Sequence, residues 1–575
     1  MGILHTRSDP MNRIKNHYHL PTFKLIVFVS LWAVFFSSCS DSPHADITQK
    51  EIVGKPEDIN AKAEDVIQGT LKDILRNSKD LADSFKIKNP EFVQFLYDEN
   101  SFQPLWSAKG LYTKYGDSLF SFIENSRRYG LFPEDYYYSR LTALKGQLIS
   151  DTASKEKKLD ASLWAYSDLL LTSAFVQVVK DLKIGRLLPD SVVAKDSSLN
   201  NAFFNDQLKI FFKAGNDSFA AQLEPRITDY QLIKSALHAF LDSANIKKFT
   251  LVSTADSTQI LSLLYQRLRE EDSTLLPKQT PDSAELSLAI KKYQKSKGMN
   301  TDGKVSGALI SKLNDNDKEK FIRVAINMDR LKEFRTLPSQ YIWVNLPSYY
   351  LQLRQSDTVV LKSRVVVGKP LTRTPVITSS ISDMITYPKW TIPESIIKKE
   401  ILPGLKKDSS YTIRKGYSLI DDNGNEVDPA TIKWKQFKDY IPYKVVQGSG
   451  DDNALGILKF NFPNKYSVYL HDTNQRYLFS NKSRALSHGC VRVQAWEQLA
   501  KFILRNDSTY STNAVPVDSL ESWLTTKQKR YIPVRRPIPL YIRYITCDVK
   551  DGHLAFYEDI YGEDKRIREK VFSDK

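Results

Sequence analysis

The segments YSVYLHDT at residues 466–473 and SHGCVRV at residues 487–493 decide how the fold and chemistry of this chain are interpreted. The first segment alternates aliphatic residues with Tyr469 and His471, and alternate side chains of a β-strand share one face. We therefore expect Tyr469 and His471 to point to the same side of a strand. The aliphatic residues between them should turn toward a core.

The second segment contains Cys490, which has the surroundings of a reactive thiol. The apolar spacing over 493–503 predicts a helix, so Cys490 is expected close to a helix N-terminus, and Arg492 follows two residues later. Both features favour the thiolate form. His471 could accept the thiol proton and later protonate a leaving amine. Gly489 would let backbone N–H groups approach a developing oxyanion.

The composition of the 575 residues is that of a globular protein, with 41% hydrophobic and 26% charged residues. At about 150 residues per domain, this length indicates about four domains. The net charge of +15 suits an anionic partner, either nucleic acid, an anionic membrane or an acidic cell-wall polymer. The sequence contains no CxxC, HExxH, GxxxxGK[ST] or GxGxxG motif, so neither a metal site nor a nucleotide cofactor has support.

The N-terminus has the pattern of an export signal. Residues 25–36, LIVFVSLWAVFF, are too few to cross a bilayer and follow a basic stretch. The small residues before Cys39 resemble a bacterial lipobox, which implies cleavage before Cys39 and lipidation of its thiol. We expect 1–38 to be a lipoprotein signal peptide, 39–60 a tether, and the mature chain a membrane-anchored lipoprotein of the periplasm. A plain signal peptide with an incidental cysteine is the alternative.

Helical patterns dominate the first part of the exported chain, over residues 61–275. The nearly all-apolar run at 161–183 predicts a buried helix that ends at Gly185. Residues 276–318 contain an AIKKYQ helix, a DGKV turn and a closing LN, and they resemble a small peptidoglycan-binding module. An ordinary helical hairpin is the alternative for this segment.

From residue 340 the pattern changes to alternating β-branched and aromatic residues, which predicts a β-rich domain over 340–575. The segment 394–450 is polar and contains a DDNG turn, so we interpret it as a capping insertion that acts as a mobile lid over the site. Cys547 falls in a strand pattern and is expected to be a core residue.

The spacing of these residues resembles the signature of L,D-transpeptidases of the YkuD type, which is a His, a spacer, [S/T]HGC, and an Arg or Asn soon after. In this chain the signature consists of His471, the spacer 472–486, SHGC at 487–490 and Arg492. Further similar segments, such as YGLFPEDY and YPKWTIPESI, extend the resemblance over most of residues 60–575, to the long periplasmic members.

The resemblance implies a multidomain α+β fold, with a mainly helical N-terminal scaffold, a small helical peptidoglycan-binding module and a β-rich catalytic domain with a capping insertion. His488 is a departure, because some long members carry Ser there, so His471 is the expected base and His488 a helper. The resemblance implies these site residues: catalytic Cys490, His471, His488, Gly489 and Arg492, supported by Tyr469 and Ser487.

The resemblance also implies a reaction. Cys490 would attack the third residue of a tetrapeptide stem, release D-Ala and form a thioester. An amine of a second stem would then resolve the thioester into a third-to-third cross-link. The implied partners are donor and acceptor peptidoglycan stem peptides, with carbapenem-type β-lactams as inhibitors. A nucleic-acid partner is not expected, because the chain is exported.

Three alternatives remain open from the sequence. The thioester could be resolved by water, as in an L,D-carboxypeptidase or another cysteine peptidase of the wall. The chain could be a non-catalytic lipoprotein that tethers peptidoglycan. Ser395 and Lys398 fit the SxxK tetrad of serine acyl-enzymes, although no KTG or SxN partner accompanies them.

Overall fold

The computed structural model describes residues 50–76, 87–153, 159–187, 198–253, 258–274 and 282–575, which belong to one compact unit. The predicted signal peptide, Cys39 and the first part of the predicted tether lie outside these residues. The end of that tether is folded rather than loose. Strand β1 (Ile52–Val53) pairs with β4 (Leu159–Asp160), and Val53 is buried.

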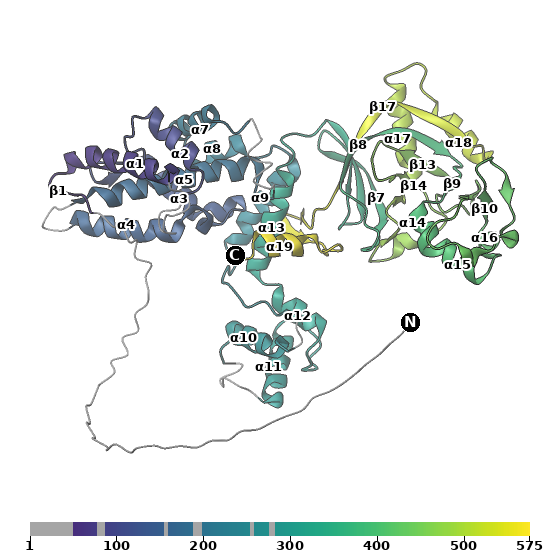
Figure 1. Cartoon of the computed structure of the whole chain (residues 1–575), viewed down its shortest axis with the longest axis horizontal. Coiled ribbons are helices and arrows are strands. Elements are labelled where there is room, and N and C mark those ends of the chain that lie inside the picture. Colours follow the sequence, from purple (N-terminus) through teal and green to yellow (C-terminus); the bar gives the residue numbers. More distant parts are fainter. Residues whose placement is uncertain (1–49, 77–86, 154–158, 188–197, 254–257, 275–281) are drawn as a thin grey trace, which may run out of the picture. The chain divides into compact units, whose positions relative to one another are not determined.

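The N-terminal helical region is built around α5 (Ala161–Ile184), which is buried on nearly all sides (Figure 1). Its first turn is capped by the Asp160 side chain, and it ends at Gly185 with a φ of 74°, as the apolar run predicts. Its length and composition would also suit a membrane span, but 89% of its most apolar window is buried inside the fold. The helices packed against α5 are α1 (Ile59–Arg76), α2 (Pro90–Glu99), α3 (Lys114–Glu124), α4 (Tyr138–Ala153), α7 (Asn201–Ala214) and α8 (Asn216–Leu223).

Three further helices share a small core of their own. They are α10 (Ile260–Glu271), α11 (Ser283–Ser296) and α12 (Gly307–Asn314), and the core includes Ile290, Tyr293 and Leu309. Asp282 begins α11 with a capping box, because its side chain accepts from the N–H of Glu285. The next helix, α13 (Asp317–Leu331), packs with α9 (Thr228–Leu241) in a separate apolar cluster.

Within residues 340–543, all of which are described, nine strands form one sheet in the order β15-β7-β16-β14-β13-β8-β17-β5-β6. β6 also pairs with β7, so the strands from β7 to β6 form a closed ring. The apolar face of the sheet packs against α17 (Trp496–Ser508) and α18 (Val517–Thr525). The strands are β5 (Gln340–Asn345), β6 (Tyr350–Gln355), β7 (Thr358–Gly368), β8 (Ile377–Thr386), β13 (Leu458–Asn461), β14 (Leu470–His471), β15 (Ala485–Ser487), β16 (Val491–Val493) and β17 (Arg530–Arg543).

The segment between β8 and β13 folds as a subdomain, residues 390–447, which we call the cap. It contains its own sheet in the order β11-β10-β12-β9 and a core that includes Ile401, Leu405 and Trp434. The polar composition of 394–450 therefore conceals an apolar core. The elements of the cap are β9 (Trp390–Thr391), α14 (Glu394–Ile396), a π-helical turn (Ile397–Ile401), α15 (Leu402–Lys407), α16 (Tyr411–Arg414), β10 (Tyr417–Ile420), β11 (Glu426–Val427) and β12 (Lys444–Gln447).

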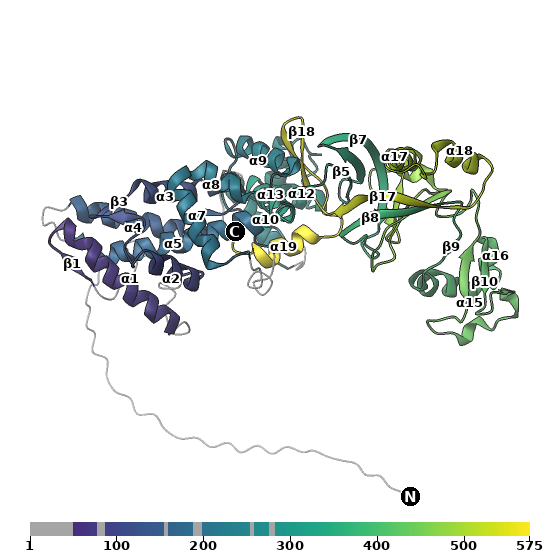
Figure 2. The same ribbon diagram turned by 90° about the horizontal axis from the view of Figure 1, so that it is seen from above.

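The C-terminal residues return to the helices. The hairpin of β18 (Cys547–Lys550) and β19 (His553–Phe556) contacts α9, and α19 (Glu563–Val571) contacts α13 (Figure 2). Cys547 is fully buried in the apolar cluster of α9 and α13. This agrees with its expected place in a core.

Candidate functional site

The signature residues lie on two neighbouring strands of the sheet. β14 and β16 run parallel, with Leu470 opposite Val491 and His471 opposite Arg492. The side chains of Leu470 and Val491 enter the apolar core, so the alternate residues of both strands face the other side. This places four predicted site residues together on one face: Tyr469, His471, Cys490 and Arg492.

Cys490 ends the short connection from β15 to β16, and its thiol is half-buried. The thiol is hydrogen-bonded to the Tyr469 hydroxyl, and its Sγ lies 4.0 Å from the carbonyl oxygen of Ser467. Burial raises the pKa of Cys490, whereas the bonds with Tyr469 and the charges of Lys459 and Arg492 lower it. Three neighbours thus favour the thiolate against the cost of burial.

The predicted helix N-terminus next to Cys490 is wrong. α17 begins only at Trp496, and Cys490 is followed instead by strand β16. Val493 lies in strand β16, but its side chain packs in the same apolar core as α17. It therefore continues the helical spacing of apolar residues over 493–503 without being part of the helix. Activation of the thiol by a helix dipole therefore has no support, and the positive side chains on the sheet take that role.

His471 is a buried, neutral imidazole. Burial and the charge of Arg492 lower its pKa to about 3, while contacts with the backbone of Asp472 and Leu455 act in the opposite direction. The ring of Tyr469 lies edge-on to the imidazole, with 5.6 Å between the centroids. At neutral pH His471 is thus unprotonated and able to accept a proton.

Lys459 is a site residue that sequence reasoning missed. It lies on β13 directly opposite His471, and its Nζ is 4.0 Å from the centroid of the Tyr469 ring. Burial lowers the pKa of Lys459, and the negative charge of a Cys490 thiolate would raise it. The alternation of Lys459 with Leu458 and Phe460 indicates a side chain that faces away from the core, but it does not indicate that Lys459 lies opposite His471.

We expect Lys459→Met to weaken the Cys490 thiolate. Removing a nearby positive charge should raise the pKa of the thiol and slow its reaction near neutral pH by up to about tenfold. The pH dependence of iodoacetamide alkylation measures this midpoint. Lys465→Met, at an exposed position before β14, is the matched control and should leave the midpoint unchanged. An unshifted midpoint in Lys459→Met would remove Lys459 from the site.

Gly489 and Ser487 shape the loop that carries the thiol. Gly489 has a φ of 125°, a conformation that L side chains rarely adopt. Its N–H donates to Ser487 Oγ at 3.1 Å, and the Ser487 hydroxyl donates to the Cys490 carbonyl at 2.6 Å. The Gly489 N–H is therefore engaged within the loop. The Ser487 hydroxyl thus links the backbone of Gly489 to that of Cys490.

The same loop is braced from the C-terminal end of the chain. The buried Thr374 hydroxyl donates to the Gly489 carbonyl at 2.7 Å, and the Tyr561 hydroxyl donates to the Gly368 carbonyl at 2.8 Å. The Thr374 N–H also donates to Tyr561 at 3.2 Å. These bonds fix the position of Gly489, and so of Cys490, from residues outside the signature.

His488 points away from the sheet and contacts the cap. Its Nε2 lies 2.5 Å from Oε1 of Glu400, in the π-helical turn of the cap. The cap makes a second approach through Trp390. Burial raises the pKa of the Tyr469 hydroxyl, and Trp390 lies close enough to act in the opposite direction, although its Nε1 has no hydrogen-bond partner among the described residues. The cap therefore reaches the candidate site at two points. His471 rather than His488 lies on the face of the sheet that carries Cys490, which supports the assignment of His471 as the base.

The SxxK pair lies on the cap and not in this site. Ser395 is exposed in α14, and Lys398 forms an ion pair with Asp439 at 3.2 Å. Among the described residues there is no cluster of three or more His, Cys, Asp or Glu side chains that could hold a metal ion.

Comparison with known proteins agrees with this geometry. Residues 339–517 match the L,D-transpeptidase catalytic domain family, YkuD, and residues 91–237 match the scaffold domain family. A curated Haemophilus influenzae protein assigned as an L,D-transpeptidase is 39% identical over 247 residues, which are 43% of this chain and 48% of that protein. The chain thus spans about half the length of the curated relative it matches.

Two solved structures are more distant. The Ldtfm–avibactam carbamoyl enzyme and a Cys-to-Ser mutant of the Enterococcus faecium L,D-transpeptidase are each 12% identical, with TM-scores of 0.16 and 0.15. The matches cover 37% of this chain and 51% and 52% of those chains. The chain is thus a multidomain α+β protein in which one segment matches the YkuD L,D-transpeptidase catalytic domain family and another matches the scaffold domain family.

Proposed function

We propose that this chain is an L,D-transpeptidase that joins peptidoglycan stem peptides from third residue to third residue through a thioester on Cys490. The observation that carries the proposal is the position of Cys490 and the neutral His471 on one face of the sheet, inside the segment that matches the catalytic domain. A thiol beside an unprotonated imidazole is suited to acyl transfer.

In the first step His471 accepts the proton of Cys490, and the thiolate attacks the carbonyl carbon of the third residue of a donor stem. Lys459 and Arg492 stabilise the thiolate, and Tyr469 donates a hydrogen bond to it. The C–N bond to D-Ala breaks, and the imidazolium returns its proton to the leaving amine. The enzyme is left as a thioester on Cys490.

In the second step the side-chain amine of an acceptor stem attacks the thioester carbonyl. The amine gives a proton to His471, the C–S bond breaks, and the thiol recovers that proton. A new amide bond links the two third residues. Water in place of the amine would give a shortened tripeptide, which is the carboxypeptidase reaction.

The cap favours the amine over water. Trp390 and Glu400 bring the cap against Tyr469 and His488 beside the thiol. A cover that excludes water protects a reactive acyl-enzyme from hydrolysis. The cap would therefore open for a stem peptide and close over the thioester.

Mass spectrometry of disaccharide-tetrapeptides incubated with the purified mature chain tests the proposal. Dimers linked from third residue to third residue are the expected products. Tripeptides alone would assign a carboxypeptidase, and unchanged substrate would assign a tethering lipoprotein. The intact mass of the chain extracted from membranes also tests the proposed lipidation of Cys39 and its place in the periplasm.

The contact between Glu400 and His488 should affect cross-linking more than acylation. Both side chains are partly exposed, so their pairing is weak and can break when the cap opens. We expect Glu400→Gln to raise the ratio of tripeptide to dimer by up to about fivefold, because a looser cap admits water. Glu394→Gln, an exposed acidic residue on the same segment, is the control. A product ratio equal to wild type would separate Glu400 from cap closure.

A further inference from the structure

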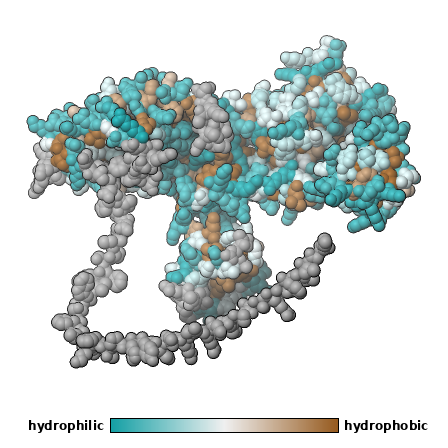
Figure 3. Space-filling model, viewed as in Figure 1, coloured by the Kyte–Doolittle hydropathy of each residue, from teal (hydrophilic) through white to brown (hydrophobic). Residues whose placement is uncertain are grey.

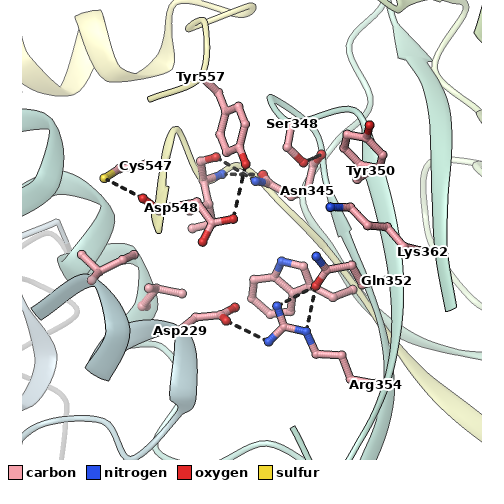
Figure 4. A pocket seen from close by; sticks show the side chains of 14 residues that line it. Asp229, Asn345, Ser348, Tyr350, Gln352, Arg354, Lys362, Cys547, Asp548 and Tyr557 are labelled. Atoms are coloured by element: carbon pink, nitrogen blue, oxygen red, sulfur yellow. Dashed lines mark hydrogen bonds and ion pairs between the residues drawn. The ribbon is translucent and has the colours of Figure 1, made fainter. Parts of the chain in front are cut away.

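A pocket forms on the polar side of β5 and β6. These strands turn Ile342, Val344 and Leu353 into the apolar core, so their alternate residues face α9 and β18. A small open pocket remains between them, and its lining shares no residue with the Cys490 site (Figure 4). Elsewhere on the visible face, hydrophobic residues are scattered among hydrophilic ones (Figure 3).

Four charged side chains line the pocket, and two of them are paired with each other. Arg354 Nη1 donates to Asp229 Oδ1 at 2.8 Å, and Arg354 also donates to Gln352 Oε1 from Nε and Nη2. The guanidinium and the carboxylate of α9 thus neutralise each other. The other two charges, on Asp548 and Lys362, decide what the pocket can bind.

Asp548 and Lys362 form no ion pair among the described residues. The Asp548 carboxylate accepts from the Val549 N–H at 2.7 Å and from the Tyr557 hydroxyl at 3.3 Å. Burial and the nearby Asp229 raise the pKa of Asp548, whereas the charge of Arg354 and the hydrogen bonds from Val549 and Tyr557 lower it. The Lys362 ammonium lies 4.7 Å from the centroid of the Tyr350 ring.

We propose that this pocket binds the head group of an α-amino acid, with the ligand ammonium on Asp548 and the ligand carboxylate on Lys362. Figure 4 shows these two side chains on different sides of the pocket, both directed toward its middle. A ligand with one positive and one negative group satisfies both charges at once, whereas a simple cation or anion satisfies only one. The aromatic side chains of Trp343 and Tyr350 also line the pocket.

The same head group could come from two sources. A free D-amino acid, such as the product released in the proposed reaction, carries it, and so does the side-chain end of a diamino acid in a stem peptide. The choice of probes rests on the proposed function, but the pocket itself does not. Because Asp229 of α9 belongs to its wall, a bound ligand would lie between the scaffold helices and the sheet.

Calorimetric titration of the full mature chain carrying Cys490→Ala tests the site without turnover. The probes are D-alanine, diaminopimelic acid, N-acetyl-D-alanine, which lacks the ammonium, and D-alaninamide, which lacks the carboxylate. We expect D-alanine or diaminopimelic acid to bind, with the tighter of the two identifying the source. Each blocked analogue should bind more weakly, and N-acetyl-D-alanine should lose more than D-alaninamide, because Asp548 is partly buried whereas Lys362 is exposed.

Asp548→Asn and Lys362→Met should each weaken binding, whereas Asp551→Asn, in the exposed turn of the same hairpin, should not. No binding of either zwitterion, or equal binding in all variants, would overturn the proposal. Acylation of Cys490 by a carbapenem in Asp548→Asn is a separate measurement. If Asp548→Asn forms the adduct and the Cys490→Ala chain binds no amino acid, the proposed pocket is rejected and the proposed function stands.

Discussion

Replacing Cys490 with alanine is expected to remove every covalent adduct that the chain forms with a carbapenem, together with all cross-linking. The strained lactam acylates a thiolate, and Cys490 is the only half-exposed thiol within the described residues. Intact-mass spectrometry should show one adduct on the wild type and none on Cys490→Ala. Cys547→Ala is the matched control and should keep the adduct, because burial raises the pKa of the Cys547 thiol and hides it in a core.

The serine alternative makes the opposite prediction. Ser395 is exposed on the cap, and the amine of Lys398 is engaged with Asp439. We therefore expect Ser395→Ala to be acylated like the wild type. An adduct that survives in Cys490→Ala and is lost in Ser395→Ala would overturn the cysteine mechanism.

Replacing His471 with alanine is expected to slow adduct formation about 10²–10⁴-fold, because the thiol loses its proton acceptor. A residual rate should remain, since a few per cent of an unassisted thiol is ionised near neutral pH. The time course of adduct formation measures the loss. His488→Ala should have a much smaller effect, because His488 contacts Glu400 of the cap. If His488→Ala formed the adduct more slowly than His471→Ala, His488 would be the base and His471 the helper.

The pH profile of acylation follows from the same groups. The pKa of His471 is lowered to about 3, so the base is lost only as the pH falls through that value. Burial raises the pKa of Cys490, so the thiolate fraction increases as the pH rises through neutrality. The rate should therefore increase steadily from pH 5 to pH 9. A limb with a midpoint near 6.5 that disappears in His471→Ala would contradict the lowered pKa.

The alternation of residues predicted the site where it concerned single strands. It placed Tyr469 and His471 on one face, and the structure has them in contact. It could not find Lys459, because the pairing of β13 with β14 is a long-range register that the local pattern does not contain. It placed the start of the helix too early. Val493 is the last residue of strand β16, but it packs in the same core as the helix α17 that follows.

The helical parts and the cap show the same contrast. The run at 161–183 was recognised as buried, because a helix that is apolar all round has no polar face to expose. The core of the cap was missed, because residues such as Ile401 and Trp434 are spread singly through a polar segment. The engagement of the Gly489 N–H depends on the rotamer of Ser487, which residue types alone do not specify.

Strand β17 lies between β8 and β5 in the sheet, although it is the last strand of that sheet in the chain. Without β17 the other strands still form one sheet through the pairing of β6 with β7, but the sheet stays open between β8 and β5 until residue 543 has left the ribosome. The hydrogen bonds of Tyr561 with Gly368 and Thr374 form later still, whereas Thr374 can already bond to Gly489. The loop that carries the nucleophile therefore gains its full set of supporting hydrogen bonds only after residue 561 has been made.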